Sequence, residues 1–310
     1  LARRFEITAD DLQPWHYADP FFQRIRASGG LKPDDYYAER DLSELAIRFF
    51  DGLGMDVRDV LERSDLFPRA GKEQHAFCTH IDRKGDIRIL ANVTPGERWM
   101  TTLLHELGHA VYERYNEQPW ELATPAHMST TEAVAMLMGR QATDIEYLIE
   151  YADVPAFDVT PLSGELRRHQ CFRMQMFMRW ALVVVHFERE LYADPVRDDL
   201  NALWWELKRK YQLIEPPDGR TEPDWAAKLH LALVPVYYQN YVIGELVASQ
   251  LRSAICEEAR IGSLVDSQYA GEFLIEQVFR HGASKRWDQL LVDATGEALN
   301  PQHFIREFTG

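Results

Sequence analysis

Residues 101–110 read Thr101-Thr102-Leu103-Leu104-His105-Glu106-Leu107-Gly108-His109-Ala110, which contains His-Glu-x-x-His within a run that predicts a helix. Positions four apart lie on one face of a helix, so His105 and His109 can hold one metal ion between them. Glu106 then lies beside that ion, where a base for a metal-bound water is needed. The motif therefore predicts a metal site built on a helix at the centre of the fold.

The motif helix has a predicted start and a predicted core face. Thr94-Pro95-Gly96-Glu97 matches a capping box with Pro at the first helical position. The apolar residues expected to face the core are Trp99, Leu103, Leu107 and Val111. The motif thus falls in the middle of a well-defined helix, which is the context it requires.

Zinc catalysis needs a third protein ligand and one open position. The cysteines offer no match, because Cys78, Cys171 and Cys256 are widely spaced and no Cys-x-x-Cys occurs. A metzincin would read His-Glu-x-x-His-x-x-Gly-x-x-His, but Tyr112 and Tyr115 stand where the Gly and the last His would be. The remaining route is a Glu on a second helix.

Glu132 is the candidate for that Glu. It is the only acid in an otherwise apolar and small helix start at 129–139. An acid in such surroundings must be paired, capped or metal-bound. The alternative is that Ser129 and Glu132 form a capping box. We expect Glu132 to be the third ligand of one zinc ion per chain.

Ligand histidines usually donate their second ring N–H to a carboxylate or a backbone carbonyl. Glu113, one turn past His109, and Asp86 are the candidates, with a solvated surface charge as the alternative for each. His127 is close enough to Glu132 in sequence to be a further candidate.

Bulk composition restricts the class of protein. The chain has 310 residues, of which 46% are hydrophobic, and its 49 acidic against 34 basic residues give a net charge of −15. That charge argues against a nucleic acid or an anionic membrane as partner. The apolar run Phe172–Phe187 is interrupted by Arg173, Gln175 and Arg179, which predicts a buried core helix and not a membrane span. The low, odd number of cysteines fits a reducing compartment, so we expect a cytoplasmic location.

Most of the chain predicts helix. Apolar residues recur every three or four positions over 40–66, 97–116, 131–151, 163–192, 197–213, 236–260 and 270–281. The segment His75–Val93 differs, because two β-prone runs at 76–81 and 87–90 flank a polar turn and predict a β-hairpin. The expected fold class is all-α, mainly helical, with a small antiparallel β-hairpin beside the active-site cleft, in a single domain over 1–310.

The stretch Lys228–Tyr241 places a Lys, a His and three Tyr within 14 residues. Together with the metal motif it resembles the peptidyl-dipeptidase family of angiotensin-converting enzyme and the related thimet oligopeptidase and oligoendopeptidase F family. In those families a Lys-x-His followed by a Pro and paired Tyr residues lines the catalytic cleft. Asp11–Trp15, Gly282–Trp287 and Thr295-Gly296 agree with the same pattern. The resemblance covers nearly all of this chain, which corresponds to only the catalytic half of a typical family member. The first residue is not Met and no signal-like apolar segment follows it, so we expect the C-terminal half of a longer protein.

The resemblance implies a zinc metallopeptidase of the gluzincin type. His105, His109 and Glu132 would bind zinc. Glu106 would take a proton from the zinc-bound water and give it to the leaving amine.

The resemblance also implies roles in binding the peptide. Tyr241 and His230 would donate hydrogen bonds to the oxyanion. His75-Ala76 would lie on an edge strand that pairs with the substrate backbone. Lys228 and Tyr238 would bind the free C-terminal carboxylate of the peptide.

The chain departs from the family pattern at four places. Asn240 replaces the Arg between the paired Tyr residues, which puts chloride dependence in doubt. Met136 replaces the acid four residues after the third ligand, and Asn92 replaces the second Cys that brackets the hairpin. One residue is inserted before Tyr238, so Tyr237 could take its place in the alignment.

The expected activity is hydrolysis of short, unstructured peptides. Lys228 favours C-terminal recognition and hence a peptidyl-dipeptidase. Two alternatives stay open: an oligoendopeptidase that needs no free C-terminus, and a peptide-binding module that has lost catalysis. A helical carboxypeptidase of the Taq type is less favoured, because its third Glu lies in a different local motif.

Overall fold

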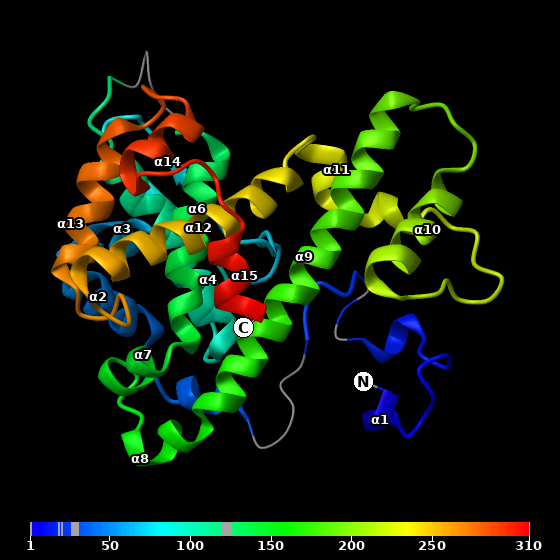
Figure 1. The fold of residues 1–310 in the computed structure, drawn as a ribbon, viewed down its shortest axis with the longest axis horizontal. Helices are drawn as coiled ribbons and strands as arrows, with labels where there is room; N and C mark the ends of the chain where they lie inside the picture. The colour runs from blue at the N-terminus through cyan, green and yellow to red at the C-terminus, as the bar shows by residue number, and fades with distance from the viewer. Residues whose placement is uncertain (1, 18, 20, 26–30, 120–125, 310) are drawn as a thin grey trace. The chain divides into compact units, whose positions relative to one another are not determined.

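The computed structural model describes residues 2–17, 19, 21–25, 31–119 and 126–309 (Figure 1). The chain divides into two compact units. Unit 1 comprises Leu1–Ser28 and Arg168–Val242, and unit 2 comprises Gly29–Arg167 and Ile243–Gly310. The single domain expected over 1–310 stays a prediction.

The described residues of unit 1 form helices joined by loops, with no strand among them. Its helices are α1 (Ala2–Phe5), most of α9 (Ser163–Ala193), α10 (Leu200–Gln212), α11 (Leu229–Leu233) and the first turn of α12 (Tyr238–Ala259). An aromatic core joins α9 to α10, where the rings of Trp180 and Phe187 meet Trp204 edge-on at centroid distances of 5.8 and 5.1 Å. Edge-to-face aromatic pairs add to the hydrophobic stabilisation of a core. The run predicted to form a core helix lies within α9, as expected, although Phe172 is 53% exposed. In the part of the chain that the structure covers, no helix combines the length and apolarity needed to cross a membrane.

Unit 2 carries the remaining elements. They are α2 (Leu42–Gly52), α3 (Arg58–Arg63), β1 (Phe77–His80), β2 (Ile87–Leu90), α4 (Glu97–Arg114), α6 (Met128–Arg140), α7 (Ile145–Glu150), α8 (Ala156–Val159), the rest of α12, α13 (Gln268–Gln277), α14 (Trp287–Thr295) and α15 (Gln302–Thr309). Helix α4 packs along α6 (Figure 1). It also packs against both strands. The predicted fold class, mainly helical with a small antiparallel hairpin, is confirmed.

Two predicted helices are each broken in the structure. The helix predicted over 40–66 is two helices, because α2 ends at Gly52 and Gly54 takes a φ of 73° that stops it. The helix predicted over 131–151 begins earlier, at Met128, and ends at Arg140. Asp144 then starts α7 by accepting the N–H of Glu146 at 2.9 Å.

The hairpin is antiparallel, with Phe77 opposite Leu90 and His80 opposite Ile87. Ile87 and its second neighbour Ile89 are buried, so one face of β2 packs on the core of unit 2. Strand β1 is an edge of this two-stranded sheet among the described residues. It begins at Phe77, so the expectation that His75-Ala76 lies on the edge strand is wrong, because both residues immediately precede the strand.

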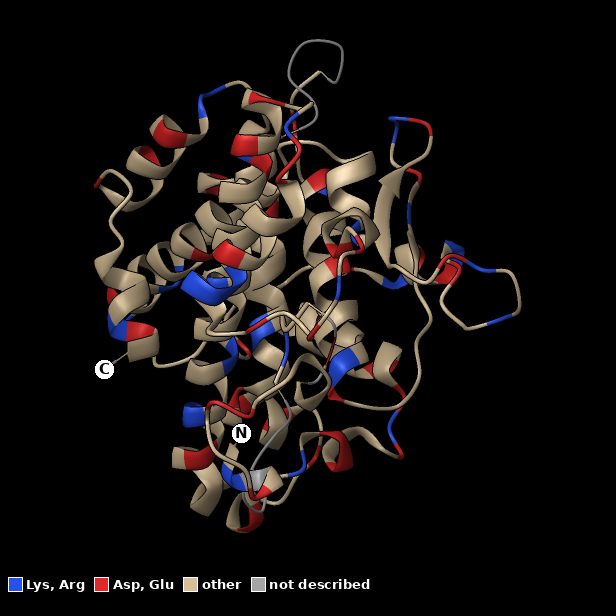
Figure 2. Ribbon diagram, turned by 90° about the vertical axis from the view of Figure 1, so that its right-hand side faces the viewer, with Lys and Arg blue, Asp and Glu red and all other residues tan. Residues whose placement is uncertain are grey.

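Charged side chains of both signs are interspersed along the described chain (Figure 2). Many form exposed ion pairs, such as Arg63 with Asp59 at 2.7 Å and Arg69 with Asp65 at 2.6 Å. Each exposed pair of this kind contributes about 0–1 kcal/mol to stability. The exposed ion pairs therefore contribute little to the stability of the fold.

Candidate metal centre

Helix α4 begins at Glu97, and the capping box predicted at Thr94–Glu97 is wrong. The N-cap is Gly96, whose φ of 143° favours glycine, and it makes no side-chain cap. Instead the Asp34 carboxylate accepts the N–H of Glu97 at 3.0 Å. A carboxylate at this end also complements the partial positive charge of the helix N-terminus. Leu103, Leu107 and Val111 of this helix are buried as predicted, and Trp99 is half-buried.

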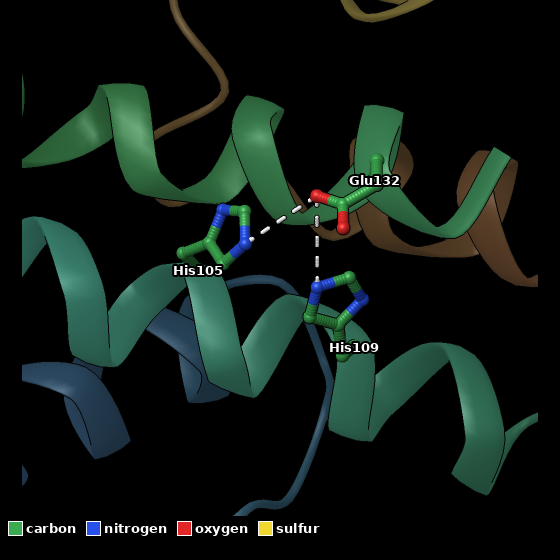
Figure 3. A group of neighbouring side chains, drawn as sticks. All are labelled: His105, His109 and Glu132. Atoms are coloured by element: carbon green, nitrogen blue, oxygen red, sulfur yellow. Dashed lines mark ion pairs between the residues drawn. The ribbon is translucent and has the colours of Figure 1, made fainter. Parts of the chain in front are cut away.

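Helix α6 does not start with the alternative capping box of Ser129 and Glu132. Its N-cap is His127, whose Nδ1 accepts the N–H of Ser129 at 3.2 Å. Glu132 is left to point at α4 (Figure 3). This removes the competing explanation for an acid at that position.

Small residues let the helices of the centre approach one another closely. A Cβ on Gly139 of α6 would stand 3.4 Å from the Cβ of His105. A Cβ on Gly244 of α12 would stand 3.2 Å from the Cβ of Glu132. The second distance is tighter than most Cβ contacts and the first is close to ordinary contact, so the absence of a side chain at these glycines leaves room for His105 and Glu132.

The three predicted ligands meet in unit 2. His105 and His109 project from successive turns of α4 and Glu132 projects from α6 into the same space (Figure 3). The Glu132 Oε2 atom lies 3.5 Å from Nε2 of His105 and 3.8 Å from Nε2 of His109. The three donor atoms all lie within 4.8 Å of one another. The sequence prediction that brought them together is therefore reproduced by the geometry.

The donor set fits zinc. Two imidazole nitrogens and one carboxylate oxygen are the ligands of catalytic His₂Glu zinc sites, which keep the fourth position open. Donors on a tetrahedron about 2.0–2.1 Å from zinc lie about 3.3 Å apart. The separations of 3.5 and 3.8 Å between Glu132 Oε2 and the two histidine nitrogens are wider than that, and all three donors lie within 4.8 Å, so the side chains would have to move inward to coordinate one ion.

Burial keeps the histidines ready to bind a cation. It lowers the pKa of His105 to about 4. The pKa of His109 falls well below its ordinary value, through burial and the neighbouring His105. Both rings are therefore neutral at pH 7, and a neutral ring offers the lone pair that a metal requires.

Glu106 is buried beside the ligands at 7% exposure. Burial raises its pKa to about 8, the negative charge of Glu132 adds to the rise, and a hydrogen bond from the Cys78 backbone N–H opposes it. A metal cation at the centre would offset the charge of Glu132. A carboxyl whose pKa lies near 7 can both accept and return a proton.

The second ring nitrogen of His109 has a partner that the sequence did not suggest. Its Nδ1 lies 2.8 Å from the hydroxyl oxygen of Thr131. Glu113, the predicted partner, lies 3.6 Å from His80 of β1, and the Asp86 carboxylate pairs with Arg88 at 2.7 Å.

His127, the third candidate, caps α6 and lies near the ring of Trp287. A clue to the true partner was available, because a hydroxyl side chain immediately precedes the Glu ligand at position 131.

The predicted C-terminal recognition residues lie together in unit 1. Lys228 is buried, with its ammonium 5.4 Å from the ring centre of Tyr238 and 5.4 Å from that of Trp180. Gln23 Oε1 lies 3.4 Å from the same ammonium. Burial lowers the pKa of Lys228 to about 8, with Asp19 acting in the opposite sense.

Tyr241 and His230 are also in unit 1, with the Tyr241 hydroxyl 3.2 Å from His230 Nε2. Tyr238 is buried and its hydroxyl accepts a hydrogen bond from Trp180 Nε1 at 2.8 Å. Tyr237, its competitor in the alignment, is half-buried and its ring meets that of Tyr241 at 5.2 Å. The contact with Lys228 favours Tyr238 over Tyr237 as the partner of the lysine.

Comparison with known proteins identifies relatives over nearly the whole chain. A family model described as angiotensin-converting enzyme matches residues 27–308. The angiotensin-converting enzyme of Theromyzon tessulatum is 26% identical over 276 residues, covering 84% of this chain and 44% of the relative. The angiotensin-converting enzyme-like protein Ace3 of Mus musculus is 35% identical over 303 residues, covering 89% of this chain and 39% of the relative. The chain thus spans less than half the length of these relatives.

Proposed function

The chain belongs to the angiotensin-converting enzyme family, and on that premise we propose that it is a zinc peptidyl-dipeptidase that cleaves short peptides. The observation that carries the proposal is the gathering of His105, His109 and Glu132 beside the buried Glu106. The first three would hold zinc, which when bound supplies a Lewis acid that acidifies water and polarises the scissile carbonyl.

Glu106 is the proposed proton carrier. Its carboxylate accepts a proton from the attacking water and returns it to the amine that leaves. The Cys78 N–H holds this carboxylate, which keeps it oriented through both transfers. A pure binding module has no use for a buried carboxyl of this kind, since burying it without a task costs stability.

Tyr241 and His230 are the proposed donors to the carbonyl oxygen as it gains negative charge. Their mutual contact of 3.2 Å supports the pairing, because the imidazole can orient the phenol hydroxyl. Removing one such donor lowers kcat by about 100- to 1000-fold.

The peptide itself is proposed to be held at two places. Its backbone would add to the free edge of β1, which begins directly after His75-Ala76. Its C-terminal carboxylate would be bound by Lys228 and Tyr238. A buried ammonium ringed by aromatic faces interacts strongly with a carboxylate because few waters compete with it. We also propose a cytoplasmic location, on the low number and wide spacing of the cysteines.

The test combines metal content with cleavage of a quenched peptide that carries either a free or an amidated C-terminus. We expect one zinc per chain and cleavage of the free acid alone. Glu106→Gln should retain zinc and peptide binding while turnover falls about 100- to 10,000-fold. Unchanged turnover in that variant would sink the mechanism.

Two further outcomes distinguish the alternatives. Equal cleavage of both peptides would point to an oligoendopeptidase without C-terminal recognition. Zinc and peptide binding without turnover in the unaltered chain would point to a binding module. Lys228→Met should raise KM for the free acid alone, and the exposed Lys210→Met serves as its control.

A further inference from the structure

The two ring nitrogens of His109 face two consecutive residues of α6. Nε2 lies 3.8 Å from Glu132 Oε2, and Nδ1 lies 2.8 Å from Thr131 Oγ1. One turn at the start of α6 therefore contacts both sides of a single imidazole on α4.

This arrangement bears on which nitrogen carries the proton. A neutral imidazole has one N–H and one lone pair, and a metal binds the lone pair. If Nδ1–H donates to the Thr131 oxygen, the lone pair is on Nε2 and is directed at the space shared with Glu132. The hydroxyl is well suited to this task because a β-branched side chain on a helix has few χ1 rotamers.

The position where the family pattern has an acid, four residues after the third ligand, is apolar in this chain. Met136 follows Glu132 by four residues, is 8% exposed and offers no hydrogen-bond acceptor of comparable strength. The other predicted carboxylates, Glu113 and Asp86, are engaged with His80 and Arg88.

We propose that Thr131 is a positioning residue of the metal centre: its hydroxyl accepts the Nδ1–H of His109 and so fixes the ring and the tautomer that present Nε2 to zinc. The proposal rests on the zinc site of the proposed function. It adds that the partner of the His109 Nδ1–H is a neutral hydroxyl, on the residue before the third ligand, where a carboxylate or a backbone carbonyl is usual.

The experiment measures zinc affinity by competition with a chromophoric chelator in the full chain. Thr131→Val, which removes the hydroxyl at nearly constant shape, should weaken zinc binding about 10- to 100-fold. Thr131→Ser, which keeps the hydroxyl, should stay within about threefold of the unaltered chain. Thr131→Ala gives a second deletion of the hydroxyl should the valine variant fold poorly, and it should weaken zinc binding like the valine.

The tautomer gives a readout that needs neither zinc nor activity. In the zinc-free protein labelled with ¹⁵N-histidine, the His109 signals should report a proton on Nδ1, and Thr131→Val should shift the population toward Nε2–H. Thr102→Val is the matched control, because Thr102 lies on α4 and its hydroxyl donates to the Arg98 carbonyl of the same helix at 2.9 Å.

Two results would overturn the proposal, and they separate it from the proposed function. If the unaltered chain binds zinc and both hydroxyl deletions bind it equally tightly, Thr131 has no positioning role and the peptidase assignment stands. If the unaltered chain binds no zinc at all, both fail together.

Discussion

Gly108 of α4 lies so close to Ala135 of α6 that a Cβ on Gly108 would stand 2.7 Å from the Ala135 Cα. That atom belongs to the backbone, so it cannot move aside as a flexible side chain could. Gly108 lies between the two histidine ligands, and Ala135 lies one turn past the third ligand. The distance between the two helices, and hence the size of the metal centre, depends on this contact.

Gly108→Ala should therefore force α4 and α6 apart. We expect overpacking to lower the free energy of unfolding by about 1–3 kcal/mol. The donors on α4 would also recede from Glu132, so zinc affinity should fall. Urea denaturation and chelator competition measure the two effects.

Gly262→Ala is the matched control for that change. A Cβ on Gly262 would meet no atom within 4 Å, and the φ angle of Gly262 is not positive. A surface change of this type stays within about 0.5–1 kcal/mol of neutral. If Gly108→Ala behaved like Gly262→Ala in both measurements, the contact would have no part in setting the metal centre.

The ligand set was predictable from the sequence because the information is local. Four-residue spacing on one helix pairs His105 with His109, and Glu132 stands out as a single acid among apolar neighbours. The break of the helix predicted over 40–66 had a local signal too, in Gly52 and Gly54. The resemblance to known enzymes supplied the residues of unit 1, which no periodicity could have singled out.

The cap of α4 and the hydrogen-bond partners of His109 and Glu106 could not be predicted, because they depend on contacts between segments distant in the chain. Asp34 caps α4 from 63 residues away, so the local pattern Thr94–Glu97 was misread as a capping box. The Thr131–His109 bond crosses between helices, and the Cys78 N–H reaches Glu106 from a strand. Tertiary placement decides such partners, and it overrides local propensity.

The segment before the hairpin is held by one buried lysine. The Lys72 side chain is 1% exposed, and its ammonium donates to the Asp65 and Phe67 carbonyls at 2.9 Å, to the Ala91 carbonyl, and to the Asp65 carboxylate at 2.9 Å. Asn92, which stands where relatives of this type were expected to carry a Cys, donates to the Glu73 carbonyl at 2.8 Å. These hydrogen bonds thus join residues 65–73, which precede the hairpin, to residues 91 and 92, which follow it.

Lys72→Met should leave those carbonyls without their donor. We expect a loss of about 3 kcal/mol in the free energy of unfolding, since each buried acceptor left unpaired costs about 1–3 kcal/mol. Hydrogen exchange at residues 72–93 should accelerate. Lys84→Met, in the exposed turn of the hairpin, should leave both quantities nearly unchanged. Equal behaviour of the two variants would contradict the role assigned to Lys72.

Unit 1 should become more stable as the pH rises from about 8 to 10. Lys208 is 1% exposed among the rings of Trp204 and Trp205, and burial lowers its pKa to about 8. Between that pKa and the value of about 10.4 expected in the unfolded chain, the unfolded state binds more protons, so stability increases with pH. Above pH 10 the sign reverses, because burial raises the pKa of Tyr238 and the folded state then holds the extra proton.

Urea denaturation followed by tryptophan fluorescence checks this slope. Lys208→Met should reduce the slope by about half, because Lys228, whose pKa burial also lowers to about 8, remains in unit 1. Lys210→Met, an exposed change on the same helix, should leave the slope in place. A slope as steep in Lys208→Met as in the unaltered chain would exclude Lys208 as a source of the effect, and a fall in stability over pH 8–10 would contradict the burial of titrating lysines.

The turn before α12 carries backbone strain. Val236 takes a φ of 57°, which is costly for a β-branched residue, and its N–H donates to the Glu188 carboxylate at 2.5 Å. Its side chain is 52% exposed, so little packing repays that conformation. Val236→Gly should therefore raise the free energy of unfolding. The left-handed conformation costs a residue with a Cβ about 1–2 kcal/mol, which glycine avoids. Glycine also gives the unfolded chain more conformational entropy, which offsets about 0.5–1 kcal/mol of that gain.

Val196 provides the comparison that isolates the strain. It is 84% exposed and its N–H also donates to a carboxylate, that of Asp194 at 3.3 Å, but its φ is not positive. Val196→Gly should be neutral or destabilising, because glycine there adds entropy to the unfolded chain and relieves nothing. Opposite signs for the two substitutions in urea denaturation would locate the strain at Val236. A loss of stability in both variants would mean that the positive φ of Val236 costs no free energy, and would contradict strain in the turn before α12.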